Sequence, residues 1–287
     1  MRHAQPGASP SQAAVRQEII LCADDFGLSR EINEGIIGLA EAGRLSAVSC
    51  LSRAEFFGQQ VGKLAGLSLD RGLHLNLTEP LPDKAFCQPL PHLICNAWTR
   101  RLPIGLVVDE IDRQLDAFEA ACGAPPDYID GHQHVHQFPM IRESLIALLQ
   151  RRYPACRPWI RCTLPARFRP GLTWRSQFKA QAIGGLGARR LKALAEAAGY
   201  ATNARLLGVY GLAGGEQAYA RLLAGWLACA AGGDLLMCHP AAAVTPGDPL
   251  GEQRWAEYRA LADDRLPSLL ARHRLLIGRP LNSRQLA

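Results

Sequence analysis

Short apolar runs alternate with segments of helical period along most of the chain. Seven apolar runs have the length of β-strands, at residues 18–23, 45–51, 71–77, 127–131, 158–163, 234–238 and 274–277. The segments between them favour helices, at residues 29–42, 106–122, 140–152, 187–198, 215–231 and 252–270. This alternation predicts an α/β fold with a mainly parallel sheet and crossover helices.

Three stretches do not follow the alternation. Residues 79–103 contain five prolines and no clear period, which predicts a long loop or an insertion near the functional face. Residues 165–204 are difficult to place apart from the helix predicted within them. Residues 1–17 are rich in Ala, Gln, Ser and Pro and lack the apolar stretch of a signal peptide, so we expect a flexible N-terminal tail. The rest, 18–287, is expected to form one domain.

Composition limits the classes of function. Hydrophobic residues make up 48% and charged residues 20%, as in an ordinary globular protein. The net charge is +6, but basic pairs such as Arg151–Arg152 form no known nucleic-acid motif, so no nucleic-acid partner is expected. No run approaches the ~18 apolar residues of a membrane span. Nine cysteines are scattered without a Cys-x-x-Cys, which favours a reducing, cytoplasmic compartment.

Two adjacent carboxylates, Asp24 and Asp25, stand where the first apolar run ends, just before Gly27. In α/β proteins, catalytic groups gather at the carboxyl ends of strands. Neighbouring like charges are costly unless a cation or a raised pKa relieves them. The pair therefore predicts a metal ion.

Histidines occur in three comparable places. His74 lies in a predicted strand, on the side opposite to a stripe of leucines. The segment Asp130-Gly131-His132-Gln133-His134-Val135-His136 follows another strand; if it is extended, its aspartate and three histidines share one face. His239 follows the strand at 234–238.

Together these groups predict a metal site built at strand ends from one carboxylate of the pair, His74 and one histidine of the 130–136 segment. Mixed nitrogen and oxygen ligands suit Zn, Mn, Co, Ni or Fe, and Mg less typically. Taken singly, each feature also has a structural explanation: a strand histidine can be a satisfied structural residue, and an Asp-Asp pair can be a turn or a helix start. Their common position after strands is what favours the metal.

Four motifs also resemble one known family. Ala23-Asp24-Asp25-Phe26-Gly27-Leu28-Ser29, Gly72-Leu73-His74-Leu75, the segment 130–136 and Met237-Cys238-His239-Pro240 are similar, in this order, to motifs of the YdjC-like carbohydrate deacetylases. That family includes chitooligosaccharide deacetylases and hopanoid-biosynthesis-associated deacetylases. The resemblance runs from about residue 18 to 245 and implies a single-domain (β/α) barrel-like fold related to the polysaccharide deacetylases.

The resemblance also implies roles. It implies one divalent cation bound by Asp25, His74 and His132, with Asp24 as catalytic base and His239 as catalytic acid. Magnesium is the ion usually attributed to the family, although two imidazoles would suit zinc equally. The implied reaction removes an N-acetyl group from an amino sugar or a chitooligosaccharide-like substrate and releases acetate. The resemblance further suggests a homodimer.

Two other functions fit the same residues. A metal-dependent phosphoesterase would use Asp and His ligands at strand ends, although phosphomonoester sites often bind two metals and need more carboxylates. A sugar-binding protein could keep the fold without activity. The sequence leaves open whether the substrate is a chitooligosaccharide, a glycolipid or another acetylated sugar.

Overall fold

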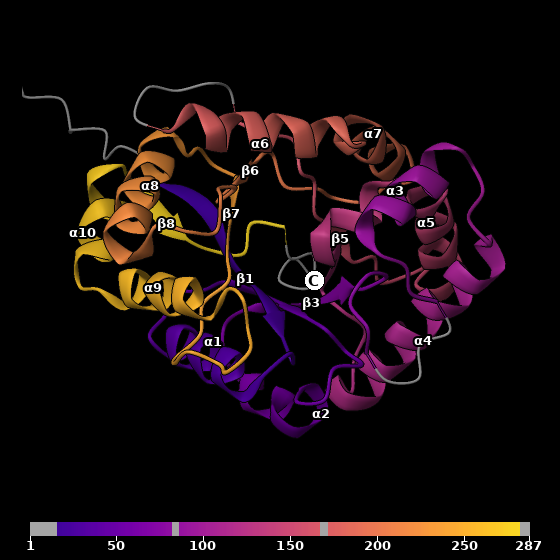
Figure 1. Cartoon of the computed structure of the whole chain (residues 1–287), viewed down its shortest axis with the longest axis horizontal. Coiled ribbons are helices and arrows are strands. Elements are labelled where there is room, and N and C mark those ends of the chain that lie inside the picture. Colours follow the sequence, from indigo (N-terminus) through magenta and orange to yellow (C-terminus); the bar gives the residue numbers. More distant parts are fainter. Residues whose placement is uncertain (1–15, 82–85, 167–171, 282–287) are drawn as a thin grey trace, which may run out of the picture.

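In a computed structural model, a ring of helices surrounds one parallel sheet that curves into a barrel (Figure 1). The structure describes residues 16–81, 86–166 and 172–281. Eight strands build the sheet: β1 (Gln17–Phe26), β2 (Ala47–Cys50), β3 (Asp70–Leu75), β4 (Tyr128–Gly131), β5 (Trp159–Ile160), β6 (Leu206–Leu207), β7 (Leu235–Cys238) and β8 (Leu275–Ile277).

The connections between strands are mostly helical, as parallel pairing requires. They comprise α1 (Arg30–Glu41), α2 (Phe57–Gln60), α3 (Leu90–Trp98), α4 (Ile104–Cys122), α5 (Ile141–Arg152), α6 (Trp174–Gly185), α7 (Ala188–Ala197), α8 (Gly215–Cys229), α9 (Gly251–Ala262) and α10 (Arg265–Arg272), with 3₁₀ turns η1 (Val61–Leu64) and η2 (His132–Gln137).

The strand order is β5-β4-β3-β2-β1-β7-β6, every pairing is parallel, and β8 pairs with the start of β1. Two isolated parallel bridges, Ile160 to Thr202 and Pro165 to Leu206, join the two edges of this sheet. The predicted α/β, barrel-like fold with a parallel sheet is therefore confirmed.

Alternation along β1 separates the two layers of the core. Ile19 and Leu21 pack in the large apolar cluster beneath the helices, while Ile20 and Cys22 belong to a smaller cluster inside the barrel. Continuing this alternation brings Asp24 to the barrel interior at the carboxyl end of the strand. The strand thus supplies core packing first and a functional group at its end.

Aromatic rings fill the barrel interior below the site. Tyr128 of β4 stacks on Trp159 of β5 with ring centroids 4.1 Å apart. Gly72 of β3 makes room for them, because a Cβ there would lie 2.4 Å from the Tyr128 ring. The interior is therefore a packed floor, and the open space lies above it.

Four expectations need correction. The proline-rich stretch 79–103 contains a helix, α3, which begins after Pro89 and buries Leu93 and Ala97. The helix expected at 252–270 is two helices, α9 and α10, separated where Asp263 binds the backbone and side chain of Arg265. Within 165–204, α6 was not predicted. The expected tail overlaps β1, which begins at Gln17, and residues 1–15 lie outside the described residues.

Candidate active site

A cavity of about 740 Å³ opens at the carboxyl ends of the strands, and its floor carries the predicted site residues. Asp24, Asp25, His74, His132 and His239 all line it. Its walls are mainly apolar and come from several connections between strands, including Leu90 of α3, Ile183 of α6, Leu212 and Leu250. The predicted placement of the 79–103 stretch near the functional face is thus confirmed by Glu79 and Leu90 in this lining.

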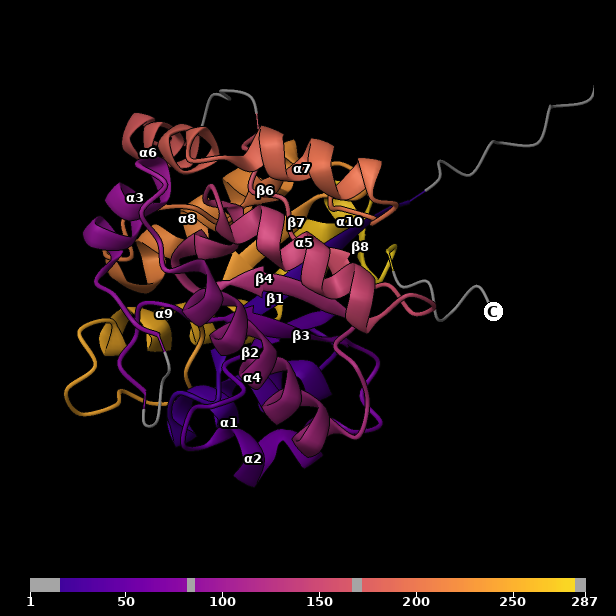
Figure 2. The same ribbon diagram turned by 90° about the vertical axis from the view of Figure 1, so that its right-hand side faces the viewer.

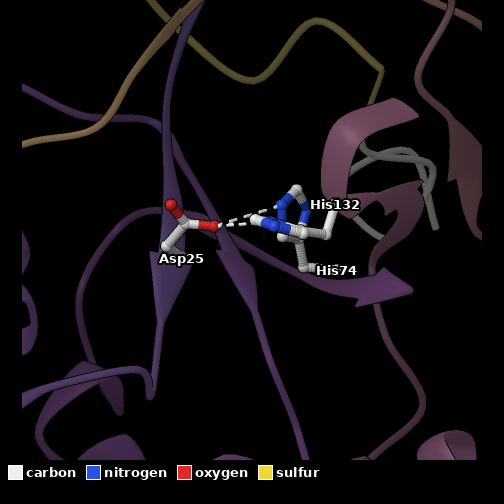
Figure 3. A group of neighbouring side chains, drawn as sticks. All are labelled: Asp25, His74 and His132. Carbon is white, nitrogen blue, oxygen red and sulfur yellow. Dashed lines mark hydrogen bonds and ion pairs between the residues drawn. The ribbon is translucent and has the colours of Figure 1, made fainter. Parts of the chain in front are cut away.

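Three side chains form a group that could hold a metal ion (Figure 3). The ligand atoms of Asp25, His74 and His132 all lie within 4.8 Å of one another. Asp25 Oδ1 is 3.0 Å from His132 Nδ1 and 3.5 Å from His74 Nε2. They come from β1, β3 and the residue after β4, so the parallel sheet brings together positions far apart in the sequence.

An irregularity in β1 directs Asp25 to this group. The pairing register with β2 shifts between Ala23 and Phe26, and Asp25 has a left-handed backbone with φ 72°. In a regular strand adjacent side chains diverge, whereas a bulge re-aims one of them. Both carboxylates of the pair consequently reach the same cavity.

His74 is oriented for ligation by Asp130. Its Nδ1 is 2.7 Å from Asp130 Oδ1, which leaves Nε2 to face Asp25. A carboxylate on the far nitrogen is the usual companion of a metal-binding histidine. Burial alone would lower the pKa of His74, but Asp130 and the hydrogen bonds to Asp130 and Asp25 outweigh it and raise the pKa to about 10. The same field that attracts a proton would attract a metal cation.

Asp24 has a different partner, the fully buried Arg161. The guanidinium donates two hydrogen bonds of 2.7 Å to the two oxygens of Asp24, and Nη2 also lies 2.7 Å from Asp130 Oδ2. Although burial opposes ionisation, Arg161 holds the pKa of Asp24 well below its usual range. Asp24 therefore stays ionised. Asp24, His74 and Asp130 form a second possible ligand group, but the Arg161 guanidinium already binds its two carboxylates.

The second oxygen of Asp25 binds Arg254 of α9. Arg254 Nη2 is 2.8 Å from Asp25 Oδ2, and its Nε is 2.9 Å from Asp248 Oδ2. Despite burial, Arg254 and the two histidines hold the pKa of Asp25 well below its usual range. The carboxylates thus outnumber the guanidiniums, three to two, which leaves a net negative charge suited to a cation. The three buried carboxylates are Asp24, Asp25 and Asp130.

His239 lies on the other side of Asp24. It follows β7, and its Nε2 is 4.0 Å from Asp24 Oδ2. Its backbone N–H donates a 2.6 Å hydrogen bond to the buried Glu257 of α9, which also accepts one from Tyr210. Burial raises the pKa of Glu257, although His239 and these hydrogen bonds oppose the rise. His239 Nδ1 has no hydrogen-bond partner among the described residues.

The histidine segment is not extended, so the prediction that Asp130, His132, His134 and His136 share a face is wrong. Residues 132–137 form the turn η2, in which Gln133 and His134 have left-handed backbones. His132 faces Asp25, whereas His136 binds the Arg161 carbonyl at 2.9 Å on the buried side. His134 lines the cavity, and burial lowers its pKa to about 3.

Sequence reasoning missed two cations that organise the site, Arg161 and Arg254. Arg161 left a signal, because it stands in the predicted apolar strand 158–163, where an unpaired charge would be unfavourable. Arg254 left none, since arginine is common on helices and only the tertiary structure brings α9 to Asp25.

The fold and the site define a parallel α/β-barrel protein whose strand ends carry a candidate metal centre beside a second carboxylate and a histidine. The family model for YdjC-like protein matches residues 18–272. The chain therefore belongs to the YdjC-like family, as the motifs indicated.

Curated relatives have deacetylase names. A chitooligosaccharide deacetylase of Proteus mirabilis is 35% identical over 147 residues, which are 47% of this chain and 56% of the relative. A carbohydrate deacetylase of Brevibacillus brevis is 33% identical over 153 residues, 50% of this chain and 60% of the relative. The human carbohydrate deacetylase is 28% identical over 148 residues, 47% and 46% of the two chains. The chain spans about half the length of the curated relatives it matches.

A solved structure shares the fold. A protein of Enterococcus faecalis, provisionally described as a cellobiose-phosphate cleavage protein, has a TM-score of 0.68 and 20% identity. The match covers 95% of this chain and 99% of that protein.

Proposed function

We propose that this protein is a divalent-metal-dependent carbohydrate N-deacetylase that hydrolyses the acetamido group of an amino sugar and releases acetate. One observation carries the proposal: a candidate metal group, Asp25–His74–His132, adjoins a separate pair, Asp24 and His239, in one cavity. The deacetylase names of the relatives support the same chemistry.

We assign Asp25, His74 and His132 as the metal ligands. The donor set fits a divalent ion, because one carboxylate and two imidazoles converge and His74 is oriented by Asp130. When bound, such an ion polarises a carbonyl and acidifies water. Magnesium is the choice that the resemblance suggests, and zinc suits the imidazoles; the choice between them is one for experiment.

Asp24 is the proposed base. Arg161 keeps it ionised and fixes its orientation, so it can take a proton from the attacking water. Water oxygen forms the new bond to the acyl carbon while the carbon–nitrogen bond of the amide breaks. His239, in its protonated form, gives a proton to the departing amine. Their positions on neighbouring strand ends let the two groups act on opposite atoms of one amide.

Location and assembly remain predictions. We extend the proposal to a cytoplasmic homodimer, as expected from the sequence. All nine cysteines are free thiols, which fits a reducing compartment. No helix within the described residues is long and apolar enough to cross a membrane.

The test is release of acetate from diacetylchitobiose, with a generic phosphoester assayed beside it. The proposal predicts acetate, loss of activity with EDTA and its return with a divalent metal. Phosphate release without acetate would instead support the phosphoesterase, and binding without either product would support a sugar-binding protein.

A further inference from the structure

The positive charge of the chain is concentrated in one stretch. Residues 144–195 contain eleven lysines and arginines and no aspartate or glutamate, whereas the whole chain has a net charge of only +6. This stretch includes helices α6 and α7. Figures 1 and 2 show that these two helices follow one another along one side of the molecule.

The outer side of α6 carries two protruding aromatic rings. Trp174 is 69% exposed and Phe178 is 66% exposed, more than any other large hydrophobic side chain in the described part of the chain. They are four residues apart and therefore neighbours on one side of the helix. The guanidinium of Arg175 lies 5.4 Å from the centroid of the Trp174 ring. Only Ser176 of α6 is buried, so little of the helix is covered.

Cations accompany these rings. Arg175 of α6 and Arg189 and Arg190 of α7 are exposed. None of the three pairs with a carboxylate among the residues that the structure describes. Exposed aromatic rings are unfavourable in water, whereas exposed arginines are not. Two such rings beside unpaired cations on two contacting helices therefore indicate a partner that is both apolar and anionic.

We propose that the α6–α7 surface binds the face of an anionic lipid bilayer. Tryptophan and phenylalanine that enter the headgroup region, flanked by arginine and lysine, are the composition of peripheral membrane-binding helices. Single-stranded nucleic acid also stacks on aromatic rings, but it needs stacking rings arranged along a track of charges. Here both rings occupy one helical turn, which favours insertion at one point.

The position of the surface gives the binding a consequence. Lys179 and Ile183 of α6 line the cavity at the strand ends, so one helix contributes both to the cavity wall and to the proposed membrane contact. Docking would bring the cavity beside the bilayer. The proposal concerns the surface alone and does not depend on the deacetylase assignment.

Vesicle co-sedimentation of the full chain tests it. The probes are vesicles of phosphatidylcholine alone and of phosphatidylcholine with one quarter phosphatidylglycerol. We expect partitioning at least about tenfold stronger onto the anionic vesicles, and weaker binding at high salt. Single-stranded oligonucleotide serves as the competing ligand.

Three variants separate the contributions. Two double variants should each weaken partitioning at least about tenfold. One is Trp174→Ser with Phe178→Ser, and the other is Arg189→Glu with Arg190→Glu. Trp255→Ser is the matched control, because Trp255 is 37% exposed and also lies beside an arginine (Arg259, 4.8 Å). Its helix, α9, is on a different side of the molecule from α6 and α7 (Figure 1). It should keep wild-type binding. Circular dichroism and the thermal midpoint confirm that each variant is folded.

Three results would overturn the proposal. These are equal partitioning onto neutral and anionic vesicles, unchanged binding by a folded Trp174→Ser/Phe178→Ser variant, and binding of the oligonucleotide without binding of vesicles.

Discussion

Asp24 and Asp25 are neighbours in the chain, yet each has its own cation. Arg161 binds Asp24 and Arg254 binds Asp25. This separation relieves the repulsion that made the pair informative in the sequence. It also supports different tasks, since Asp25 faces two imidazoles while Asp24 lies outside that group.

Asp24→Asn should retain the metal and lose turnover. Without a carboxylate the attacking water has no proton acceptor, so acetate release should fall about 10²–10⁴-fold. Metal content by elemental analysis should stay at the wild-type level. Acetate release at the wild-type rate would show that Asp24 is not the base.

His136 should make the stability of the fold depend on pH. Burial lowers its pKa to about 4 in the folded chain, from an ordinary value of 6.5. Between these values the unfolded chain binds a proton that the folded chain does not. The free energy of unfolding should therefore fall as the pH drops through this window, by up to about 3 kcal/mol.

Urea unfolding of the metal-free protein between pH 4.5 and 7 measures this effect. His136→Gln should reduce the dependence, while the buried His134, whose pKa is also lowered, keeps part of it. His92→Gln, at an exposed position of α3, should leave the dependence as in wild type. An identical pH dependence in wild type and His136→Gln would remove His136 as the cause.

At the scale of elements, the site depends on departures from regular structure. The β1 bulge turns Asp25 into the cavity, and η2 separates His132 from His136. Periodicity predicted every strand except the two-residue β6, and most helices, because apolar spacing reports which faces are buried. It could not predict a bulge or a left-handed turn, since these follow from packing against distant segments. The extended reading of residues 130–136 failed for this reason.

Gly131 lies where the end of β4 packs closely against the turn η2. A Cβ there would lie 2.9 Å from His136 Nδ1 and 3.0 Å from its backbone nitrogen, so the turn would have to shift. Gly131→Ala should displace His132 and weaken metal binding about 10–100-fold. A competition titration against a chromogenic chelator measures this. Gly105→Ala, where a Cβ would have no atom within 4 Å, is the control and should bind metal normally.

At the scale of the whole molecule, the barrel brings together four strand ends that are spread over more than two hundred residues of the sequence. The motifs named five candidate site residues at strand ends, and all five line one cavity. Their chemical roles stay predictions. Arg254 and the cavity walls could not be predicted, because they depend on which connections cover the barrel mouth. Arg161 was missed although it left a signal, as a charge within a predicted apolar strand.

Metal removal should destabilise the whole fold. A ligand that binds only the folded chain stabilises it by about 2.7 kcal/mol at one hundred times its dissociation constant. For a chain of this size we expect EDTA to lower the thermal midpoint by about 4–5 °C and added metal to restore it. Calorimetry of wild type and His74→Ala tests this, since the variant should respond to neither treatment. Equal responses in both proteins would count against the assigned ligands.

The central claim is that one divalent ion binds Asp25, His74 and His132 together. An anomalous difference map from crystals grown with Mn²⁺ or Zn²⁺ tests it most directly. The account predicts one strong peak about 2.0–2.3 Å from a ligand atom of each residue. A peak between Asp24 and Asp130, or a site whose ion contacts none of the three residues, would contradict it.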